Sequence, residues 1–132
     1  MTTERRSAGA TSPRRDGAEA QARALLREAG RARGRVAVVY HGDADGIASA
    51  ALARAAAERL GAEVVGLTPG RGESVYDAPL ARALVAASPT VAVILDTGAR
   101  AGATWPVPTV VVDHHPTDRA PRVDAYVHDH SA

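Results

Sequence analysis

The chain has 132 residues, of which 45% are hydrophobic, so it is long enough for one globular domain and too apolar to be a disordered protein. Its 16 basic residues, all arginine, face 15 acidic ones, and the net charge of +1 gives no argument from bulk charge for nucleic-acid binding. Without cysteine, disulfides, thiolate metal sites and cysteine nucleophiles are excluded, and no apolar run approaches the ~20 residues that cross a membrane, so we expect a cytoplasmic protein.

The N-terminal part of the chain changes in character near residue 17. Residues 1–17 are polar and rich in arginine, and we expect them to form a flexible basic leader, with residues 18–132 as the folded domain. Within residues 18–31, the spacing of Ala24, Leu25, Leu26 and Ala29 predicts an amphipathic helix that ends at a glycine. This helix is expected to pack against an edge of the domain.

The rest of the chain alternates between short apolar runs and alanine-rich runs. The apolar runs predict strands over residues 36–40, 63–67, 90–95 and 109–112, with a short fifth strand over 125–127. The alanine-rich runs predict helices over residues 47–60 and 79–87. This alternation is typical of a three-layer α/β fold, in which a parallel sheet of four to five strands has helices on both faces.

Three of the predicted strands end in acidic or imidazole side chains. In a parallel α/β sheet the carboxyl ends of the strands lie along one edge, where ligands bind. Asp and His together, without sulfur, suit Mn²⁺, Mg²⁺ or Zn²⁺, and the number of carboxylates favours two ions. The residues concerned are His41, Asp43 and Asp45 after the first strand, Asp96 after the third, and Asp113, His114 and His115 after the fourth.

These motifs, in this order, resemble the DHH phosphoesterase superfamily over residues 35–116. The matching segments are His41-x-Asp43-x-Asp45-Gly46, Asp96-Thr97-Gly98 and Asp113-His114-His115. The superfamily includes RecJ-type single-strand exonucleases, oligoribonucleases, phosphatases of adenosine bisphosphate, cyclic-dinucleotide phosphodiesterases and family II pyrophosphatases. The resemblance implies a hydrolase that cleaves phosphoesters with a water activated by two Mn²⁺ ions.

Carried over residue by residue, the resemblance also implies roles for individual side chains. Asp96 would bridge the two ions, His41 and Asp43 would hold one of them, and Asp45 and His114 would hold the other. Asp113 would fix the imidazole of His114, and His115 would meet the substrate phosphate as a hydrogen-bond donor or acid. Arg71, in the glycine-rich loop after the second strand, is a candidate for a phosphate contact, although a solvated loop arginine is the commoner case.

The sequence also departs from the family pattern. Members of the family supply a further Asp from a segment downstream of the Asp-His-His motif, and many carry a C-terminal substrate-binding domain. Neither feature is found before Ala132, so we expect a domain that is incomplete at its C-terminal end. The segment from Asp124 to His130 offers carboxylate and imidazole groups, but we favour an exposed chain end over a replacement metal ligand.

Two other functions compete with a phosphoesterase of this type. The chain could be a non-catalytic metal- or nucleotide-binding fragment, which the missing Asp favours. Asp43-x-Asp45-Gly46 also resembles the start of a haloacid-dehalogenase-type phosphatase with Asp43 as nucleophile. That family places its first Asp directly after the strand, whereas His41-Gly42 intervenes here, and the reading leaves Asp113-His114-His115 unexplained.

We therefore predict a metal-dependent phosphoesterase that contains Mn²⁺, with Mg²⁺ or Zn²⁺ as alternatives. Its substrate is expected to be a nucleotide, an oligonucleotide or a single-stranded nucleic acid, and the sequence does not choose among them. No membrane partner is expected, and nothing in the sequence indicates an oligomeric state.

Overall fold

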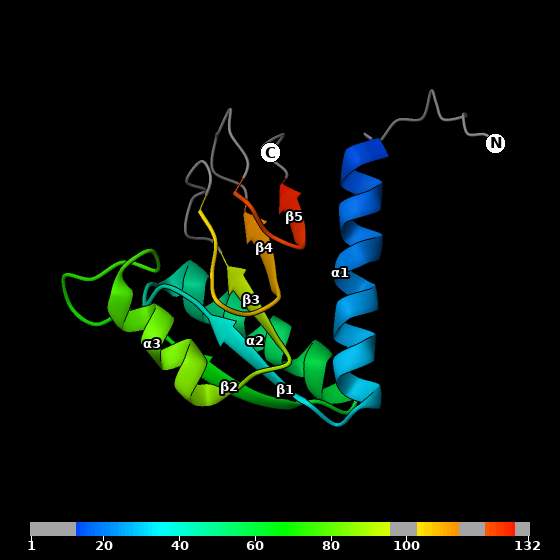
Figure 1. Cartoon of the computed structure of the whole chain (residues 1–132), viewed down its shortest axis with the longest axis horizontal. Coiled ribbons are helices and arrows are strands. Elements are labelled where there is room, and N and C mark those ends of the chain that lie inside the picture. The colour runs from blue at the N-terminus through cyan, green and yellow to red at the C-terminus, as the bar shows by residue number, and fades with distance from the viewer. Residues whose placement is uncertain (1–12, 96–102, 114–120, 129–132) are drawn as a thin grey trace.

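Five short apolar runs pair into one parallel sheet in the computed structural model, which describes residues 13–95, 103–113 and 121–128 (Figure 1). Neighbouring strands follow the order β2-β1-β3-β4-β5, and each pair is parallel. The predicted α/β fold with a parallel sheet of four to five strands is confirmed. The strands are β1 (Arg35–Val39), β2 (Glu63–Leu67), β3 (Val91–Leu95), β4 (Thr109–Asp113) and β5 (Ala125–His128).

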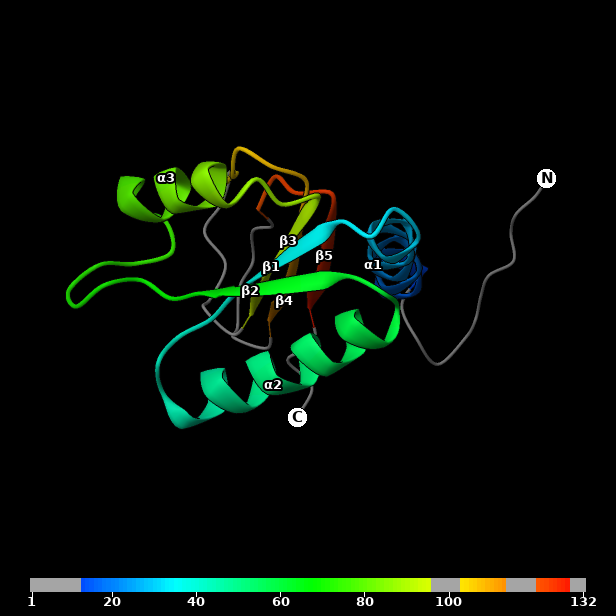
Figure 2. The ribbon, with the colours of Figure 1, turned by 90° about the horizontal axis from the view of Figure 1, so that it is seen from below.

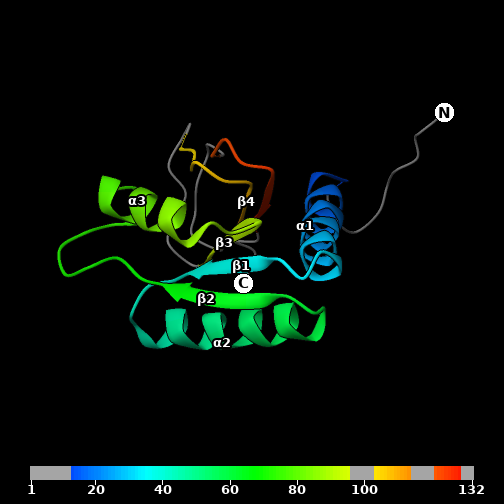
Figure 3. The same ribbon diagram turned by 60° about the horizontal axis from the view of Figure 1, so that its bottom comes forward.

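Helices cover both faces of this sheet, which confirms the three-layer arrangement (Figure 2). Helices α1 (Pro13–Arg31) and α2 (Ala44–Arg59) pack on one face, and α3 (Ala78–Ala87) packs on the other. α1 lies against β5, and α2 runs along β1 and β2 (Figure 3). None of the helices in the described part of the chain is long and apolar enough to cross a membrane.

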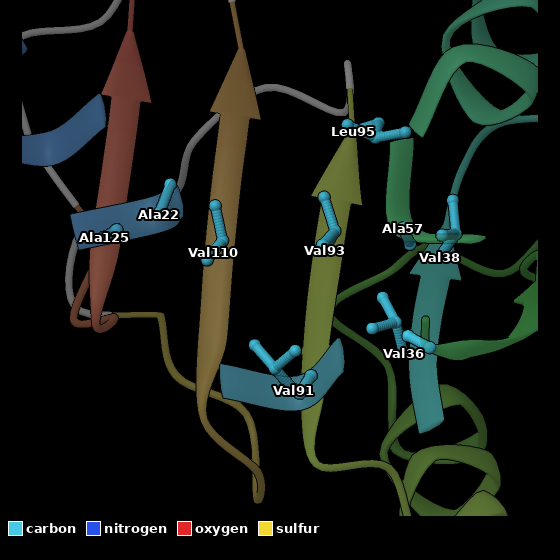
Figure 4. Packing of buried hydrophobic residues seen from close by; sticks show 11 residues of the cluster. Ala22, Val36, Val38, Ala57, Val91, Val93, Leu95, Val110 and Ala125 are labelled. Atoms are coloured by element: carbon cyan, nitrogen blue, oxygen red, sulfur yellow. The ribbon is translucent and has the colours of Figure 1, made fainter. Parts of the chain in front are cut away.

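Strands β1 and β3 are buried on both faces of the sheet. Their side chains alternate between two apolar layers. On the side of α1 and α2, Val36 and Val38 of β1 lie beside Val91 and Val93 of β3 (Figure 4). On the side of α3, the intervening residues of both strands pack against Leu80 and Leu84 of that helix. A run of small β-branched residues is therefore needed here, since neither face of these strands meets water.

The layer on the α3 side is completed by a loop residue. Trp105 is buried, and its Nε1–H donates to the carbonyl oxygen of Val75 at 2.9 Å. Its ring also contacts that of Tyr76, with 5.6 Å between the ring centroids. Together these contacts join the segment before β4 to the segment before α3, so that one short helix is enough to cover this face.

Two helices begin earlier than the sequence pattern predicts. α1 begins at Pro13 rather than at residue 18, which is compatible with proline because the first N–H groups of a helix have no partner within it. α2 begins at Ala44 rather than at residue 47, because Asp43 caps it. Within α1, Ala22, Ala29 and Gly30 are buried, whereas Ala24, which we expected on the apolar face, is exposed.

Candidate metal centre at the carboxyl edge of the sheet

The strand order reverses direction beside β1. The chain passes from β1 to β2 on one side and then crosses to β3 on the other side of β1. In sheets of this kind, ligands bind in the crevice outside the carboxyl ends of the strands that flank such a reversal. The strands in question are β1 and β3, with β4 next to β3, and these are the three strands followed by the predicted ligands.

The turn after β1 exposes its three candidate ligands at this edge. His41, Asp43 and Asp45 are all exposed to solvent. Asp43 is the N-cap of α2, and one of its carboxylate oxygens accepts a hydrogen bond from the backbone N–H of Gly46 at 2.7 Å. The side chains of His41 and Asp45 make no hydrogen bond or ion pair with any described residue. This turn therefore exposes carboxylate oxygens and imidazole nitrogens that could act as metal ligands and that bind no other described side chain.

A close backbone contact explains the glycine that ends the motif. A Cβ atom on Gly46 would lie 2.1 Å from the carbonyl oxygen of His41, a separation that no real Cβ adopts. Gly42 stands in open space, since an added Cβ there would meet nothing within 4 Å. The tight turn between β1 and α2 thus requires glycine at position 46 and not at position 42.

The end of β4 has a different character from the turn after β1. Asp113 is the last residue of β4 and is only 4% exposed. It pairs in register with His128 of β5, and the ring of His128 stacks on that of Tyr126 with centroids 5.3 Å apart. Burial, followed by the charge of Asp113 and then by Tyr76, raises the pKa of Tyr126 to about 12. The carboxylate of Asp113 is thus largely shielded from solvent, unlike the exposed side chains of the turn after β1.

The short fifth strand predicted over residues 125–127 is confirmed as Ala125–His128. Our interpretation of residues 124–130 as an exposed chain end was wrong for Ala125, which is only 4% exposed. Asp124 lies at the opposite, amino edge, where its carboxylate accepts from the backbone N–H of Thr109 at 2.9 Å. Asp124 is therefore used in pairing β4 with β5 and is not placed to replace a metal ligand. The sequence predicted this strand but not which residues it would bury, so the buried environment of Asp113 was not foreseen.

Several predicted site residues lie outside the described part of the chain or apart from the turn. Asp96, His114 and His115 lie outside the described residues, although Asp96 directly follows the last residue of β3 in the sequence. Arg71 is exposed on the loop between β2 and α3, which projects away from the sheet (Figure 2), and makes no ion pair with a described residue. Among residues 13–95, 103–113 and 121–128, no three Asp, Glu or His side chains form a group that could hold a metal ion.

The donors that are described fit a hard divalent ion in their chemistry. Exposed carboxylates and an imidazole at one turn suit Mn²⁺, Mg²⁺ or Zn²⁺. The cap hydrogen bond on Asp43 does not compete with such a role, because carboxylates that bind metals are commonly hydrogen-bonded through a second oxygen.

Comparison with known proteins gives a family and two similar solved structures. The model of the DHH family, N-terminal domain, matches residues 35–131. The chain is similar to the manganese-bound exonuclease RecJ, with 28% identity over 89% of this chain and a TM-score of 0.69. It is also similar to RecJ in complex with Mn²⁺ from Thermus thermophilus, with 26% identity over 89% of this chain and a TM-score of 0.67. The chain spans 31% and 17% of the lengths of these two chains. No curated protein matches it.

Proposed function

The chain belongs to the DHH family, and on this basis we propose that it is a divalent-metal-dependent phosphoesterase acting on the phosphoesters of nucleotides or of single-stranded nucleic acids. The family match covers most of the chain and confirms the resemblance inferred from the three motifs. The fold is that of the RecJ exonucleases, and the two structures named above contain manganese.

One structural observation carries the proposal. The three motifs follow β1, β3 and β4, which are adjacent in the sheet and parallel. Residues that are far apart in the sequence are thereby directed to one edge, at the reversal of strand order where α/β proteins bind ligands. A set of acids scattered over unrelated surfaces would not support a metal-dependent activity.

We assign the metal-binding roles from the family motif. We propose that the bound metal is a pair of Mn²⁺ ions, with Mg²⁺ or Zn²⁺ as alternatives. When bound, such a pair supplies a water that is deprotonated near neutral pH and positive charge for the phosphoryl oxygens. In this assignment His41 and Asp43 would hold one ion, Asp45 and His114 would hold the second, and Asp96 would be shared by both.

The remaining residues act on the ligands and on the substrate. The cap hydrogen bond from Gly46 fixes the orientation of the Asp43 carboxylate before any ion binds, which lowers the entropy cost of binding. In the same assignment Asp113 would accept a hydrogen bond from the imidazole of His114 and hold its orientation, a role that the burial of Asp113 supports. His115 donates a hydrogen bond or a proton to the substrate phosphate.

A metal titration and a hydrolysis assay test the proposal together. Mn²⁺ should raise the melting temperature of the wild type by mass action and support hydrolysis of bis(4-nitrophenyl) phosphate. Asp96→Ala should lose most of both responses, because it removes the ligand shared by the two ions. The control Glu58→Gln, at an exposed position in the last turn of α2, should behave as the wild type.

Two outcomes would contradict parts of this assignment. Equal Mn²⁺-induced shifts in the wild type and in Asp96→Ala would refute the bridging role. A clear Mn²⁺ response without hydrolysis in the wild type would instead favour a non-catalytic metal-binding protein.

The same preparation separates water from Asp43 as the nucleophile. If Asp43 formed an aspartyl-phosphate, as in the haloacid-dehalogenase-type alternative, beryllium fluoride would trap an adduct on it. We expect no such adduct, and we expect phosphodiesters to be cleaved in preference to simple monoesters. A trapped adduct at Asp43 would overturn the proposal.

A further inference from the structure

A hollow of about 300 Å³ lies between α2 and the carboxyl ends of β1 and β2, which is within the range of small-ligand sites. α2 runs beneath these two strands (Figure 3), and β2 is the edge strand of the sheet on this side. Its lining residues include Tyr40, Ile47, Ala50, Ala51, Arg54 and Gly66.

Small residues on both walls create this hollow. Positions 47, 50, 51 and 54 form one stripe of α2, and Ala50 and Ala51 leave the middle of that stripe empty. On the sheet, Gly66 exposes the ring of Tyr40, since a Cβ atom there would lie 3.4 Å from Cε1 of that ring. Larger side chains at these positions would fill the space, as they do in an ordinary interface between a helix and a sheet.

The walls of the hollow combine three kinds of chemistry. Tyr40 is half-buried and provides a flat aromatic surface. Ile47 is 55% exposed and contributes an apolar side chain to the wall of the hollow. Arg54 makes no ion pair or hydrogen bond with a described residue, so its guanidinium is available to an acceptor. A planar ring with acceptor atoms on its edge meets all three requirements, whereas inorganic phosphate would use only the arginine.

The hollow adjoins the candidate metal centre. Tyr40 immediately precedes His41, and Ile47 follows Asp45 by two residues. The backbone N–H of Tyr40 donates to the carbonyl oxygen of Leu67 at 3.1 Å, which holds Tyr40 at the carboxyl edge. A ligand whose phosphate lies at that edge can therefore place an attached ring in the hollow.

We propose that this hollow binds the nucleobase of a nucleotide whose phosphate is held at the neighbouring carboxyl edge, with the base against Tyr40 and its edge toward Arg54. The inference rests on the proposed function, because it takes the phosphate position from it. It goes further by assigning the recognition of the base to residues of α2 and of the β1–β2 pair. These residues lie outside the three metal-binding motifs.

The test compares two ligands that differ only by a base. Adenosine 5′-monophosphate and ribose 5-phosphate are titrated into the full chain with saturating Mn²⁺, and binding is followed by calorimetry. We expect adenosine 5′-monophosphate to bind at least about tenfold more tightly, which is the contribution that stacking of one base on an aromatic side chain typically makes. Equal affinities, or no binding of the nucleotide, would overturn the inference.

Variants then locate the binding site. Ala51→Leu fills the hollow and should bring the two affinities to within about twofold. Arg54→Gln should weaken the binding of adenosine 5′-monophosphate more than the binding of ribose 5-phosphate. The matched control Ala56→Leu makes the same substitution at an exposed position of α2 that does not line the hollow, and should keep the wild-type preference. An unchanged preference in Ala51→Leu would place the base elsewhere.

The experiment distinguishes a failure of the nucleobase site from a failure of the proposed phosphoesterase function. Ala51→Leu and Ala56→Leu should both retain the wild-type rise in melting temperature with Mn²⁺, because neither touches a proposed ligand. A normal Mn²⁺ response and normal hydrolysis, with no preference for the base, would refute the nucleobase site alone. If the wild type with Mn²⁺ does not hydrolyse bis(4-nitrophenyl) phosphate, the proposed function is refuted instead.

Discussion

Asp43 caps α2 and is also a proposed metal ligand, and substitution can separate the two roles. One oxygen caps α2 through the N–H of Gly46, and the proposed function uses the other for a metal ion. In metal-free protein, Asp43→Ala should lower the free energy of unfolding by about 1 kcal/mol, the usual cost of a lost cap. Asp43→Asn should stay close to the wild type, because asparagine caps nearly as well. Urea denaturation with a chelator present measures both.

The two variants should then behave alike toward metal. Neither alanine nor a neutral amide replaces the anionic ligand, so both should lose most of the Mn²⁺-induced rise in melting temperature. An Asp43→Asn variant that responds to Mn²⁺ as strongly as the wild type would reduce Asp43 to a helix cap.

Tyr126 gives the metal-free protein a dependence of stability on alkaline pH. Its pKa is about 12 in the folded chain because of burial first and the charge of Asp113 second, against an ordinary value of 10.0. Below pH 10 both folded and unfolded chains keep the proton, so this contribution is fully present. As the pH rises from 10 to about 12, the unfolded chain ionises first and the free energy of unfolding falls.

Tyr126→Phe should remove that part of the pH dependence, as measured by urea denaturation across the same range. The hydroxyl is buried and makes no hydrogen bond with any residue in the described ranges, so the variant should be at least as stable as the wild type at neutral pH. An unchanged alkaline slope in Tyr126→Phe would show that another group is responsible.

At the scale of the elements, the joint between β1 and α2 depends on one close backbone approach. Gly46→Ala should destabilise the chain by about 1–3 kcal/mol, because its Cβ would meet the carbonyl oxygen of His41 at 2.1 Å and the turn must move. The same shift would displace the proposed ligands, so the Mn²⁺ response should weaken as well. Gly42→Ala is the matched control and should change neither quantity, since no atom lies within 4 Å of its added Cβ. Equal effects from the two substitutions would contradict this account of the turn.

Strands were easier to predict than helix boundaries for a physical reason. β3, predicted over residues 90–95 and observed as Val91–Leu95, is buried throughout, and a strand covered on both faces needs continuous apolar residues. The start of α2 depends instead on the Asp43 cap. The spacing of polar residues alone does not show whether residues 44–46 belong to the helix or to the loop before it.

The parts of the candidate site that depend on tertiary contacts could not be read from the sequence. The motifs and the expected parallel sheet directed us to the carboxyl edge of the sheet, where the exposed turn after β1 lies. The burial of Asp113 against β5 and the hollow beside Tyr40 arise from which side chains meet across the sheet. Contacts between residues that are far apart in the sequence leave no local pattern, so the burial of Asp113 and the hollow were found only in the structure.

At the scale of the whole molecule, the folded unit extends beyond the family match. The match begins at residue 35, yet α1 precedes it and contributes Ala22 and Ala29 to the core beside β5. α1 also meets α2 closely, since a Cβ atom on Gly30 would lie 2.0 Å from the carbonyl oxygen of Leu60. α1 is therefore part of the packing that supports the sheet and not an appendage to it.

The packing of α1 can be tested with one substitution at two positions. Ala29 is fully buried, so Ala29→Leu should lower the free energy of unfolding by about 1–3 kcal/mol through overpacking. Ala24 is exposed on the same helix, and Ala24→Leu should stay within about 0.5 kcal/mol of the wild type. Because α1 lies against β5, which pairs with the strand that ends in Asp113, Ala29→Leu should also weaken the Mn²⁺ response. If both leucine variants unfold at the wild-type urea concentration, α1 packs only loosely and the domain begins at the boundary of the family match.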